Sequence, residues 1–198
     1  MAAAVTAVGA FVVEYGRIWR RGSAPLPAEA DSVVEAAVEA GVETTAVARA
    51  GYQAAPAQEN ALFNLFASFL ISLLASRGIA FLLRDHRRVG PFRNVRVGRR
   101  HIHHFVPGIV LAFVTGAIAI VTRDEKLEPK LALLFGAGMG MTMDEAALLL
   151  ELDDVYWTEE GVVGVQIGAT LVALLGALAI GLRFIRRGED QILIAPAG

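Results

Sequence analysis

The sequence predicts an all-α membrane protein, a polytopic bundle of about four transmembrane helices that follows an amphipathic helical extension at the N-terminus. Of the 198 residues, 55% are hydrophobic and only 19% are charged. The mean hydropathy is +0.53. This composition is too apolar for an ordinary soluble domain of this length. The apolar residues also gather into runs that are long enough to cross a bilayer.

The composition excludes several classes of function. The chain has no cysteine, which rules out a disulfide framework, a thiolate zinc site and a cysteine nucleophile. The formal net charge is only -2, so the total charge indicates no acidic partner. Motifs for a P-loop, a dinucleotide site, a serine nucleophile elbow or a nucleic-acid module do not occur. We expect no nucleic-acid partner.

Residues 1–60 are predicted to form an extension of interfacial and amphipathic helices. The first helix ends in "YGRIWRRG", where aromatic and arginine residues alternate as they do in interfacial helices. It is short for a complete span, so its entry into the membrane stays open. In "DSVVEAAVEAGVETTAVARA" the residues Glu35, Glu39 and Glu43 form one acidic face. This pattern predicts a solvated helix that rests on the bundle or on a partner.

Four apolar segments within residues 61–187 predict four transmembrane helices, and residues 188–198 form a C-terminal tail. Each segment is close to the roughly 20 residues that cross a hydrocarbon core. The segments are residues 61–83, 105–121, 131–150 and 162–182.

Small residues recur along three of these spans and indicate helix contacts. A polar stripe on span one repeats every fourth position: Asn64, Ser68, Ser72 and Ser76. Glycines repeat at the same spacing on spans three and four: Gly136 and Gly140, then Gly164 and Gly168. We expect span one to face another helix and spans three and four to pack closely. The glycine faces and the N-terminal helix are also candidate surfaces for a homo-oligomer or a protein partner.

The arginine-rich connection at residues 84–100 indicates the orientation. It contains seven arginines and one aspartate, a bias that retains short loops on the cytoplasmic side of the cell membrane. Span two then begins, and span three ends, at that cytoplasmic face. Four spans would place both termini outside, whereas Arg183, Arg186 and Arg187 after span four favour the opposite side.

Six ionisable residues are predicted to gather at this one membrane face. They are His101, His103 and His104 before span two, and Asp144, Glu145 and Glu151 at the end of span three. An ionisable group inside a span costs roughly 2.5–3.5 kcal/mol and needs a partner. Imidazoles and carboxylates without cysteine suit zinc, iron or manganese. Three interpretations stay open: a metal site, a structural or proton-linked cluster, and an anchor for anionic membrane lipids.

Further polar residues lie at the same face. Arg77, near the end of span one, would neutralise a carboxylate there if it is buried. Asp153 and Asp154 are either solvated charges, a helix cap or additional metal ligands. Gln166, a single amide in span four, is typical of a hydrogen bond between helices.

Two stretches carry a resemblance to a protein family. "IHHFVPG" and "MDEAALLLELDDVYWTEEG" resemble uncharacterised integral membrane proteins of actinobacteria and archaea, in which an imidazole pair precedes one span and an acidic pair ends another. The resemblance covers about residues 60–185 and leaves the N-terminal third unmatched. It implies a polytopic membrane fold and carries no activity with it.

The function predicted from these residues is a small integral membrane protein that binds a divalent metal through the histidines, with Asp144 and either Glu151 or Glu145. Whether the chain is an enzyme stays open. Such a site would support hydrolysis of a lipid-like substrate by metal-bound water, with a carboxylate as the base. The alternative is a non-catalytic subunit of a larger membrane complex. A transporter is a third class, for which four spans offer little room unless the chain oligomerises.

Overall fold

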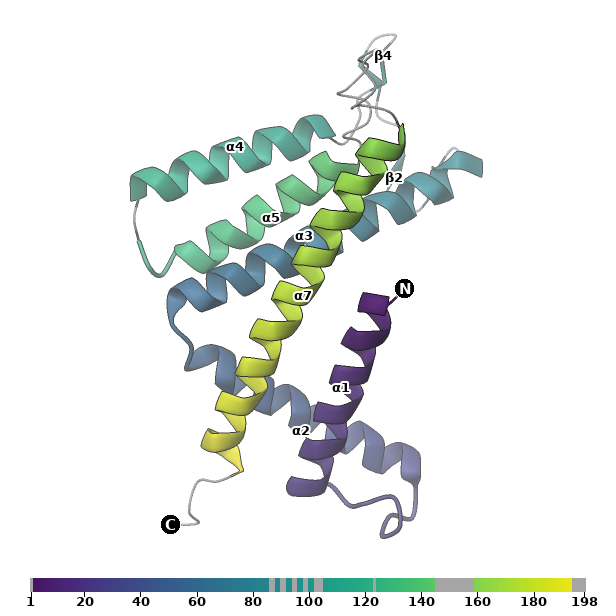
Figure 1. Ribbon diagram of the computed structural model, residues 1–198, viewed down its shortest axis with the longest axis vertical. Coiled ribbons are helices and arrows are strands. Elements are labelled where there is room, and N and C mark those ends of the chain that lie inside the picture. The colour runs from purple at the N-terminus through teal and green to yellow at the C-terminus, as the bar shows by residue number, and fades with distance from the viewer. Residues whose placement is uncertain are drawn as a thin grey trace. The chain divides into compact units, whose positions relative to one another are not determined.

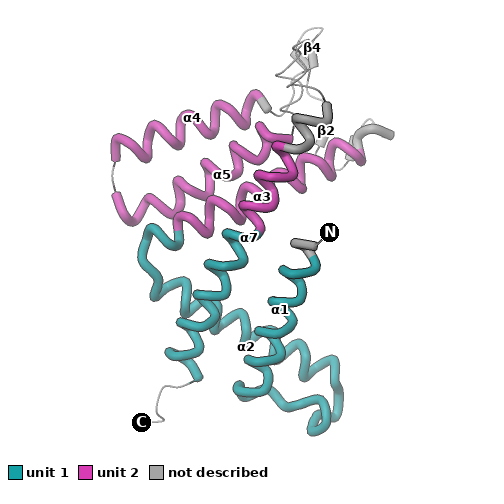
Figure 2. The backbone as a smooth tube through the Cα atoms, in the orientation of Figure 1, with its two compact units in different colours: residues 1–60, 175–198 teal, residues 61–174 magenta. Residues whose placement is uncertain are grey.

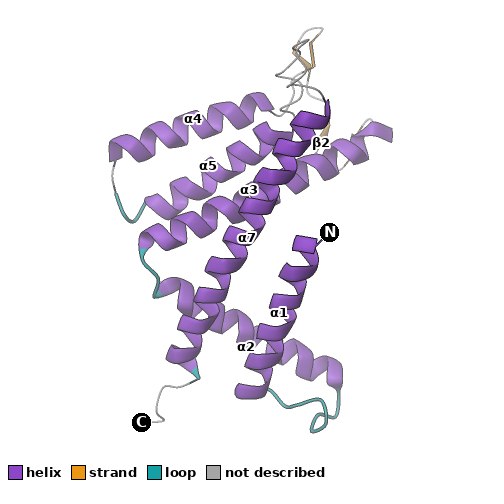
Figure 3. Cartoon of the chain, viewed as in Figure 1, coloured by secondary structure: helices purple, strands orange, loops and turns teal. Residues whose placement is uncertain are grey.

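The computed structural model describes residues 2–85, 105–122, 124–144 and 159–193, and four two-residue strands between positions 88 and 101. Helices make up most of this described part (Figures 1 and 3), which confirms the predicted all-α class. The helices are α1 (Ala2–Arg21), α2 (Val33–Gln53), α3 (Ala57–Asp85), α4 (Phe105–Thr122), α5 (Glu128–Asp144) and α7 (Glu159–Ile192).

The arginine-rich connection contains short strands that the sequence does not predict. β1 (Arg88–Val89) pairs with β2 (Phe92–Arg93), and β3 (Arg96–Val97) pairs with β4 (Arg100–His101), both antiparallel. In the sequence, each pair is separated by two residues of which the first is glycine. Two-residue connections of this kind are the common length for a tight hairpin. Regular alternation over only two residues is too short a signal to predict a strand.

Two of the described helices are long and apolar enough to cross a membrane. They are Ala57–Leu82 within α3 and Val165–Ile192 within α7, and α4 contributes a shorter apolar helix at Val106–Thr122. In each of the two long stretches only 11% of the apolar window is buried. The last part of the predicted third span, residues 145–150, lies outside the described residues. The count of four spans therefore stays a prediction.

The chain divides into two compact units (Figure 2). Unit 1 combines Met1–Asn60 with Leu175–Gly198, and unit 2 is Ala61–Leu174. The helices α3 and α7 contribute residues to both units. The sequence places residues 175–187 in the transmembrane bundle, whereas in the structure these residues pack with the N-terminal extension.

In unit 2, one face of α5 packs closely against α3. A Cβ atom added at Gly136 would collide with the Ser68 hydroxyl, and one added at Gly140 would collide with the Ser72 hydroxyl. The predicted serine stripe thus faces another helix, as expected. The glycine pair itself faces α3, whereas the contact between α5 and α7 includes the hydrogen bond from Gln166 to the Met143 carbonyl oxygen. The region around Gly168 of α7 is open, with no atom within 4 Å of an added Cβ.

The opposite face of α5 packs against α4. Gly138 lies about 200° around the helix from Gly136, since each residue turns the helix by about 100°. A Cβ at Gly138 would lie 2.7 Å from the Gly108 carbonyl oxygen and 2.8 Å from the Ala112 nitrogen. Alternate glycines in "GAGMG" therefore let α5 lie between α3 and α4 at close range, as Figure 1 shows.

Unit 1 consists of α1, α2, the first turn of α3 and the C-terminal part of α7. Its buried core is formed by Ile18, Val47 and Ile185, one from each of three helices. The buried stripe of α2 is made of small side chains, and α7 crosses this helix where a Cβ at Gly188 would collide with the Val47 carbonyl group. Small residues at the crossing allow the backbones to approach closely.

The start of α2 and its acidic residues have local explanations. Ser32 caps the helix by accepting a hydrogen bond from the Glu35 N–H, the serine half of a capping box. Glu43 accepts hydrogen bonds from the Ser23 N–H at 2.9 Å and from the Ala24 N–H at 3.4 Å. The predicted acidic face is therefore used in part to hold the connection between α1 and α2.

Candidate functional site

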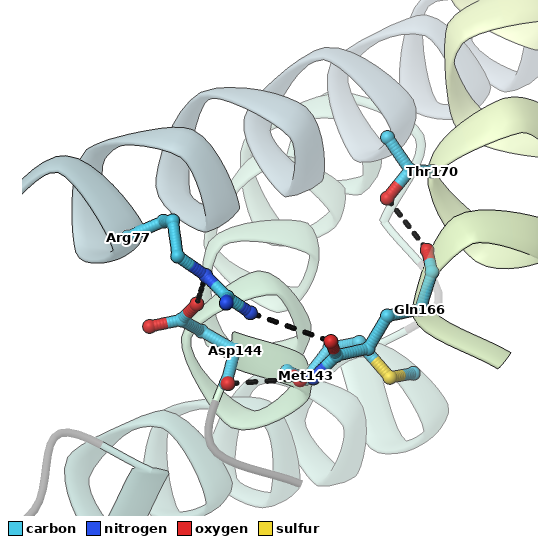
Figure 4. A network of polar contacts seen from close by, with 5 residues as sticks. All are labelled: Arg77, Met143, Asp144, Gln166 and Thr170. Carbon is cyan, nitrogen blue, oxygen red and sulfur yellow. Dashed lines mark hydrogen bonds and ion pairs between the residues drawn. The ribbon is translucent and has the colours of Figure 1, made fainter. Parts of the chain in front are cut away.

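A polar cluster joins three helices of unit 2 (Figure 4). Arg77 of α3 donates a hydrogen bond from Nε to Asp144 Oδ1 at 2.6 Å, and from Nη2 to Gln166 Oε1 at 3.3 Å. Gln166 of α7 donates from Nε2 to the Met143 carbonyl oxygen of α5 at 2.7 Å. We call these three side chains, Arg77, Asp144 and Gln166, the clamp.

The burial of the clamp is uneven. The Asp144 side chain is only 4% exposed, whereas the Arg77 side chain is 61% exposed. A buried carboxylate is costly unless a cation and hydrogen bonds compensate it. Arg77 supplies the positive charge, and its guanidinium group remains reachable from outside. Gln166 uses both ends of its amide, one as an acceptor from α3 and one as a donor to α5.

The sequence predicts two parts of this arrangement. Arg77 is expected at the same level as Asp144 and does pair with its carboxylate. Gln166 is expected to form a hydrogen bond between helices and does so. The arginine itself is mostly exposed, unlike the carboxylate that it compensates. Thr170, one turn along α7, donates to the Gln166 carbonyl oxygen at 2.7 Å within the same helix.

The start of α4 lies beside the last turn of α5. A Cβ at Gly108, in the first turn of α4, would lie 2.9 Å from Thr142 Oγ1 and 3.0 Å from Met141 Cβ. Farther along, a Cβ at Gly116 would lie 3.4 Å from the Phe135 ring, so the two helices run antiparallel. The inference that span two begins at the level where span three ends therefore holds for α4 and α5.

Most of the predicted metal ligands lie outside the described residues. These are His103, His104, Glu145 and Glu151, together with Asp153 and Asp154 of the wider cluster. His101 ends β4, where its backbone is paired with Arg96. Among the residues that the structure does describe, no group of three or more histidine, aspartate or glutamate side chains is placed to hold one ion. The metal site stays a prediction, and Asp144 already has a cationic partner.

Unit 1 contains a second polar cluster that the sequence does not reveal. Arg17 Nη2 lies 2.6 Å from Glu189 Oε2, and Arg17 Nε donates to Glu14 Oε2 at 2.7 Å. The Glu189 side chain is only 4% exposed. Arg186 lies 3.7 Å from Glu14 on the same network. We call these four residues, Glu14, Arg17, Arg186 and Glu189, the unit 1 ion-pair network.

A neighbouring pair extends the same pattern. Arg187 donates from Nη2 to Glu59 Oε2 at 2.8 Å, and Arg183 approaches Glu59 Oε1 at 3.8 Å. The arginines after the apolar part of α7, which complicate the predicted orientation, thus meet glutamates of the first sixty residues. The only signal in the sequence is complementary charge, and charge alone does not say which glutamate meets which arginine.

Comparison of the chain with protein-family models, with curated proteins and with solved structures finds no match.

Proposed function

We propose that the chain is a multi-pass integral membrane protein and that it acts as a non-catalytic, structural subunit. In this proposal the clamp holds the transmembrane helices together. The observation that carries this proposal is where small and large side chains lie in unit 2. Glycine and serine lie at the close contacts of α5, and many of the large apolar side chains are exposed. Examples are Ile71 at 68% exposure, Phe113 at 77% and Val172 at 64%.

This distribution matches a lipid environment for a physical reason. Soluble monomers rarely expose contiguous large apolar patches. In a bilayer, by contrast, lipid tails are as apolar as leucine, so helices associate through close packing of small residues and through hydrogen bonds. The glycine contacts of α5 and the hydrogen bonds of the clamp are contacts of these two kinds.

The non-catalytic role is supported by the hydrogen bonds of the clamp. Asp144 is neutralised by Arg77, and Gln166 meets partners on both other helices. A catalytic carboxylate needs access to substrate or to a metal ion, whereas Asp144 is enclosed and already paired. A structural clamp uses all three groups without a further ligand.

Resistance of the chain to extraction from membranes tests the membrane location. Membranes from cells that express the full chain are washed with alkaline carbonate and separated from the soluble fraction. An integral protein remains in the pellet and floats with the lipid in a density gradient. Release of the chain by carbonate, with the folded protein recovered in the supernatant, would contradict the proposal.

A metal centre is the second candidate function, and the position of α4 relative to α5 favours it. Because α4 begins beside the last turn of α5, the sequence directly before α4, with His103 and His104, joins that helix close to the level of Asp144. Glu145 and Glu151 follow Asp144 in the sequence. Zinc, iron or manganese bound there would supply a water nucleophile for hydrolysis of a lipid-like ester.

Metal content by mass spectrometry tests this second candidate. The variant is His103→Ala with His104→Ala, which leaves the clamp intact, and His86→Ala is the matched control. Near-stoichiometric metal in the wild type and in the control, with loss in the double variant, would make the two histidines ligands. Wild-type protein that is purified without chelator and carries no metal would end this candidate.

A further inference from the structure

Unit 1 contains an open groove with a volume of about 630 Å³. Its walls are apolar and come from three helices: Phe11 and Tyr15 of α1, Val38, Val42 and Ala48 of α2, and Ile185 of α7. Volumes of this size are typical of small-molecule sites. The groove is open to the surroundings, so its apolar walls are accessible.

The hydroxyl groups along the groove are already hydrogen-bonded within the protein. Tyr15 donates to the Ala37 carbonyl oxygen, Thr44 to the Ala40 carbonyl at 2.7 Å, and Thr45 to the Gly41 carbonyl at 2.8 Å. The walls therefore present few polar groups that still lack a donor or acceptor. A hydrocarbon chain suits such a surface better than a polar ligand does.

The ion pairs between α1 and α7 show how these two helices run relative to each other within unit 1. Glu14 pairs with Arg186 and Arg17 pairs with Glu189, so three residues along α1 correspond to three residues along α7. Within unit 1 these two helices therefore run in the same direction (Figure 1). Residues 2–13 of α1 therefore lie on the same side of the ion-pair network as residues 175–183 of α7.

The apolar half of α1 is exposed as a lipid-facing segment would be. Val5 is 69% exposed and Phe11 is 56% exposed, and this surface is continuous with the groove, because Phe11 lines it. Residues 2–13 extend for about 18 Å at the helical rise, which is about the depth of one leaflet. The aromatic pair Tyr15 and Trp19 lies at the charged end of this segment, with ring centroids 5.7 Å apart. Aromatic and arginine residues at one level are typical of a membrane interface.

An exposed arginine lies on α2, one helical turn beyond residues that line the groove. Gly41 and Thr45 line the groove, and Arg49 continues the same helix face one turn farther along α2. Arg49 is exposed and forms no ion pair with any residue in the described part of the chain. Arginine binds phosphate oxygens in a bidentate geometry, which makes it the preferred residue for such groups.

We propose that the groove of unit 1 is a binding site for an anionic phospholipid, with one acyl chain along Phe11, Val38 and Val42 and the phosphate on Arg49. This inference rests on the proposed membrane location and adds the identity of a bound lipid. The groove supplies affinity for the acyl chain, which every phospholipid shares. Arg49 supplies the preference for an anionic headgroup over a zwitterionic one.

Native mass spectrometry of the full chain in detergent measures this preference directly. The probes are dioleoyl phosphatidylglycerol and dioleoyl phosphatidylcholine, added in equal amounts. We expect a single copy of the anionic lipid to remain bound, favoured by roughly tenfold, a factor in the range of one charge-assisted hydrogen bond. Equal retention of the two lipids would overturn the assignment of the headgroup to Arg49.

Two variants separate the two parts of the site, each with a matched control. Gly41→Leu adds an apolar side chain to the groove lining, at a position where no atom lies within 4 Å of an added Cβ. Gly9→Leu is the control, because Gly9 is equally open at Cβ and lies outside the groove lining. Arg49→Gln removes the free cation, and Arg20→Gln removes another exposed arginine that has no ion pair in the described part of the chain.

The four variants have distinct expected results. Gly41→Leu loses both lipids, Arg49→Gln loses only the preference for the anionic lipid, and the two controls behave as wild type. Retention of lipid by Gly41→Leu at the wild-type level would overturn the groove as the site. A chain that stays in carbonate-washed membranes and yet shows this result would contradict the lipid site alone. Release of the chain by carbonate would contradict the membrane location itself.

Discussion

Arg77 Nε donates a 2.6 Å hydrogen bond to Asp144 Oδ1, between residues 67 positions apart in the sequence. The carboxylate is enclosed while most of the guanidinium side chain is exposed. The pair therefore compensates a charge that the close packing of α3 and α5 would otherwise make unfavourable. Gln166 adds the third helix to the same point.

The uneven burial predicts unequal effects of removing the two partners. Arg77→Gln leaves an enclosed carboxylate without its cation, whereas Asp144→Asn leaves an arginine that water or lipid headgroups can solvate. We expect Arg77→Gln to lower the free energy of unfolding by about 1–2 kcal/mol, between the values for surface pairs and for buried pairs. Asp144→Asn should cost less. Thermal unfolding in one detergent, followed by tryptophan fluorescence, compares the two variants.

A double-mutant cycle provides the control for this comparison. The variant Arg77→Gln with Asp144→Asn should be more stable than Arg77→Gln alone, because no uncompensated charge remains. Strictly additive losses in the cycle would show that the two side chains do not interact in the folded protein.

Close packing by Gly138 predicts a large effect of a single methyl group. In Gly138→Ala the new Cβ would lie within 3 Å of backbone atoms of α4, which cannot rotate away as a flexible side chain can. We expect a loss of about 1–3 kcal/mol through displacement of α4 from α5. The matched control is Gly168→Ala, where the space is open and the change improves helix propensity. Similar unfolding midpoints for the two variants would contradict the packing of α4 on α5.

How much of unit 2 could be predicted depends on which feature is considered. The serine stripe of α3 is readable because a helix places every fourth residue on one face. The small-residue spacing at Gly136 and Gly140 predicts that a helix approaches closely, but it carries no information on which helix approaches. Span four has the same spacing, so the pattern favours it as the partner, whereas α3 occupies that face in the structure.

Unit 1 was harder to predict because its contacts join distant parts of the chain. Glu59 and Arg187 form an ion pair although they are 128 positions apart. Local periodicity says which face of α2 is acidic, but it does not identify a partner helix. The buried face of α2 turned out to be the small one, at Ala36, Ala40 and Thr44, since small residues allow α1 and α7 to pack closely.

The unit 1 ion-pair network predicts that removal of one charge loosens α1. Arg17→Met leaves Glu189 buried without its closest cation, which is at 2.6 Å. We expect faster amide hydrogen exchange along α1 in this variant, because the helix loses its main polar contact with α7. The double variant Arg17→Met with Glu189→Met should restore part of the protection, since a buried pair can be replaced by apolar residues at low cost.

Arg20→Met is the control for this measurement, because Arg20 is exposed and forms no ion pair with a residue that the structure describes. Wild-type exchange in Arg17→Met would show that the ion pair between Arg17 and Glu189 does not hold α1 in place.

The proposed membrane location and orientation predict a pattern of chemical labelling. Because the chain has no cysteine, single cysteines can be introduced without removing any native thiol. Phe113→Cys and Ile71→Cys replace side chains that are highly exposed in the protein alone, and lipid should shield both from a membrane-impermeant maleimide. Lys126→Cys lies in the exposed turn between α4 and α5 and should react in intact cells, because a cytoplasmic arginine-rich connection places this turn outside.

Asn94→Cys, in the arginine-rich connection, completes the set and should react only after the cells are permeabilised. Labelling of Phe113→Cys as fast as Lys126→Cys would mean that water reaches the outer face of α4, which contradicts a lipid-facing helix. Reaction of Asn94→Cys in intact cells, with protection of Lys126→Cys, would leave the membrane location in place and reverse the orientation. The arginines after α7 would then lie on the side that the positive-inside rule favours.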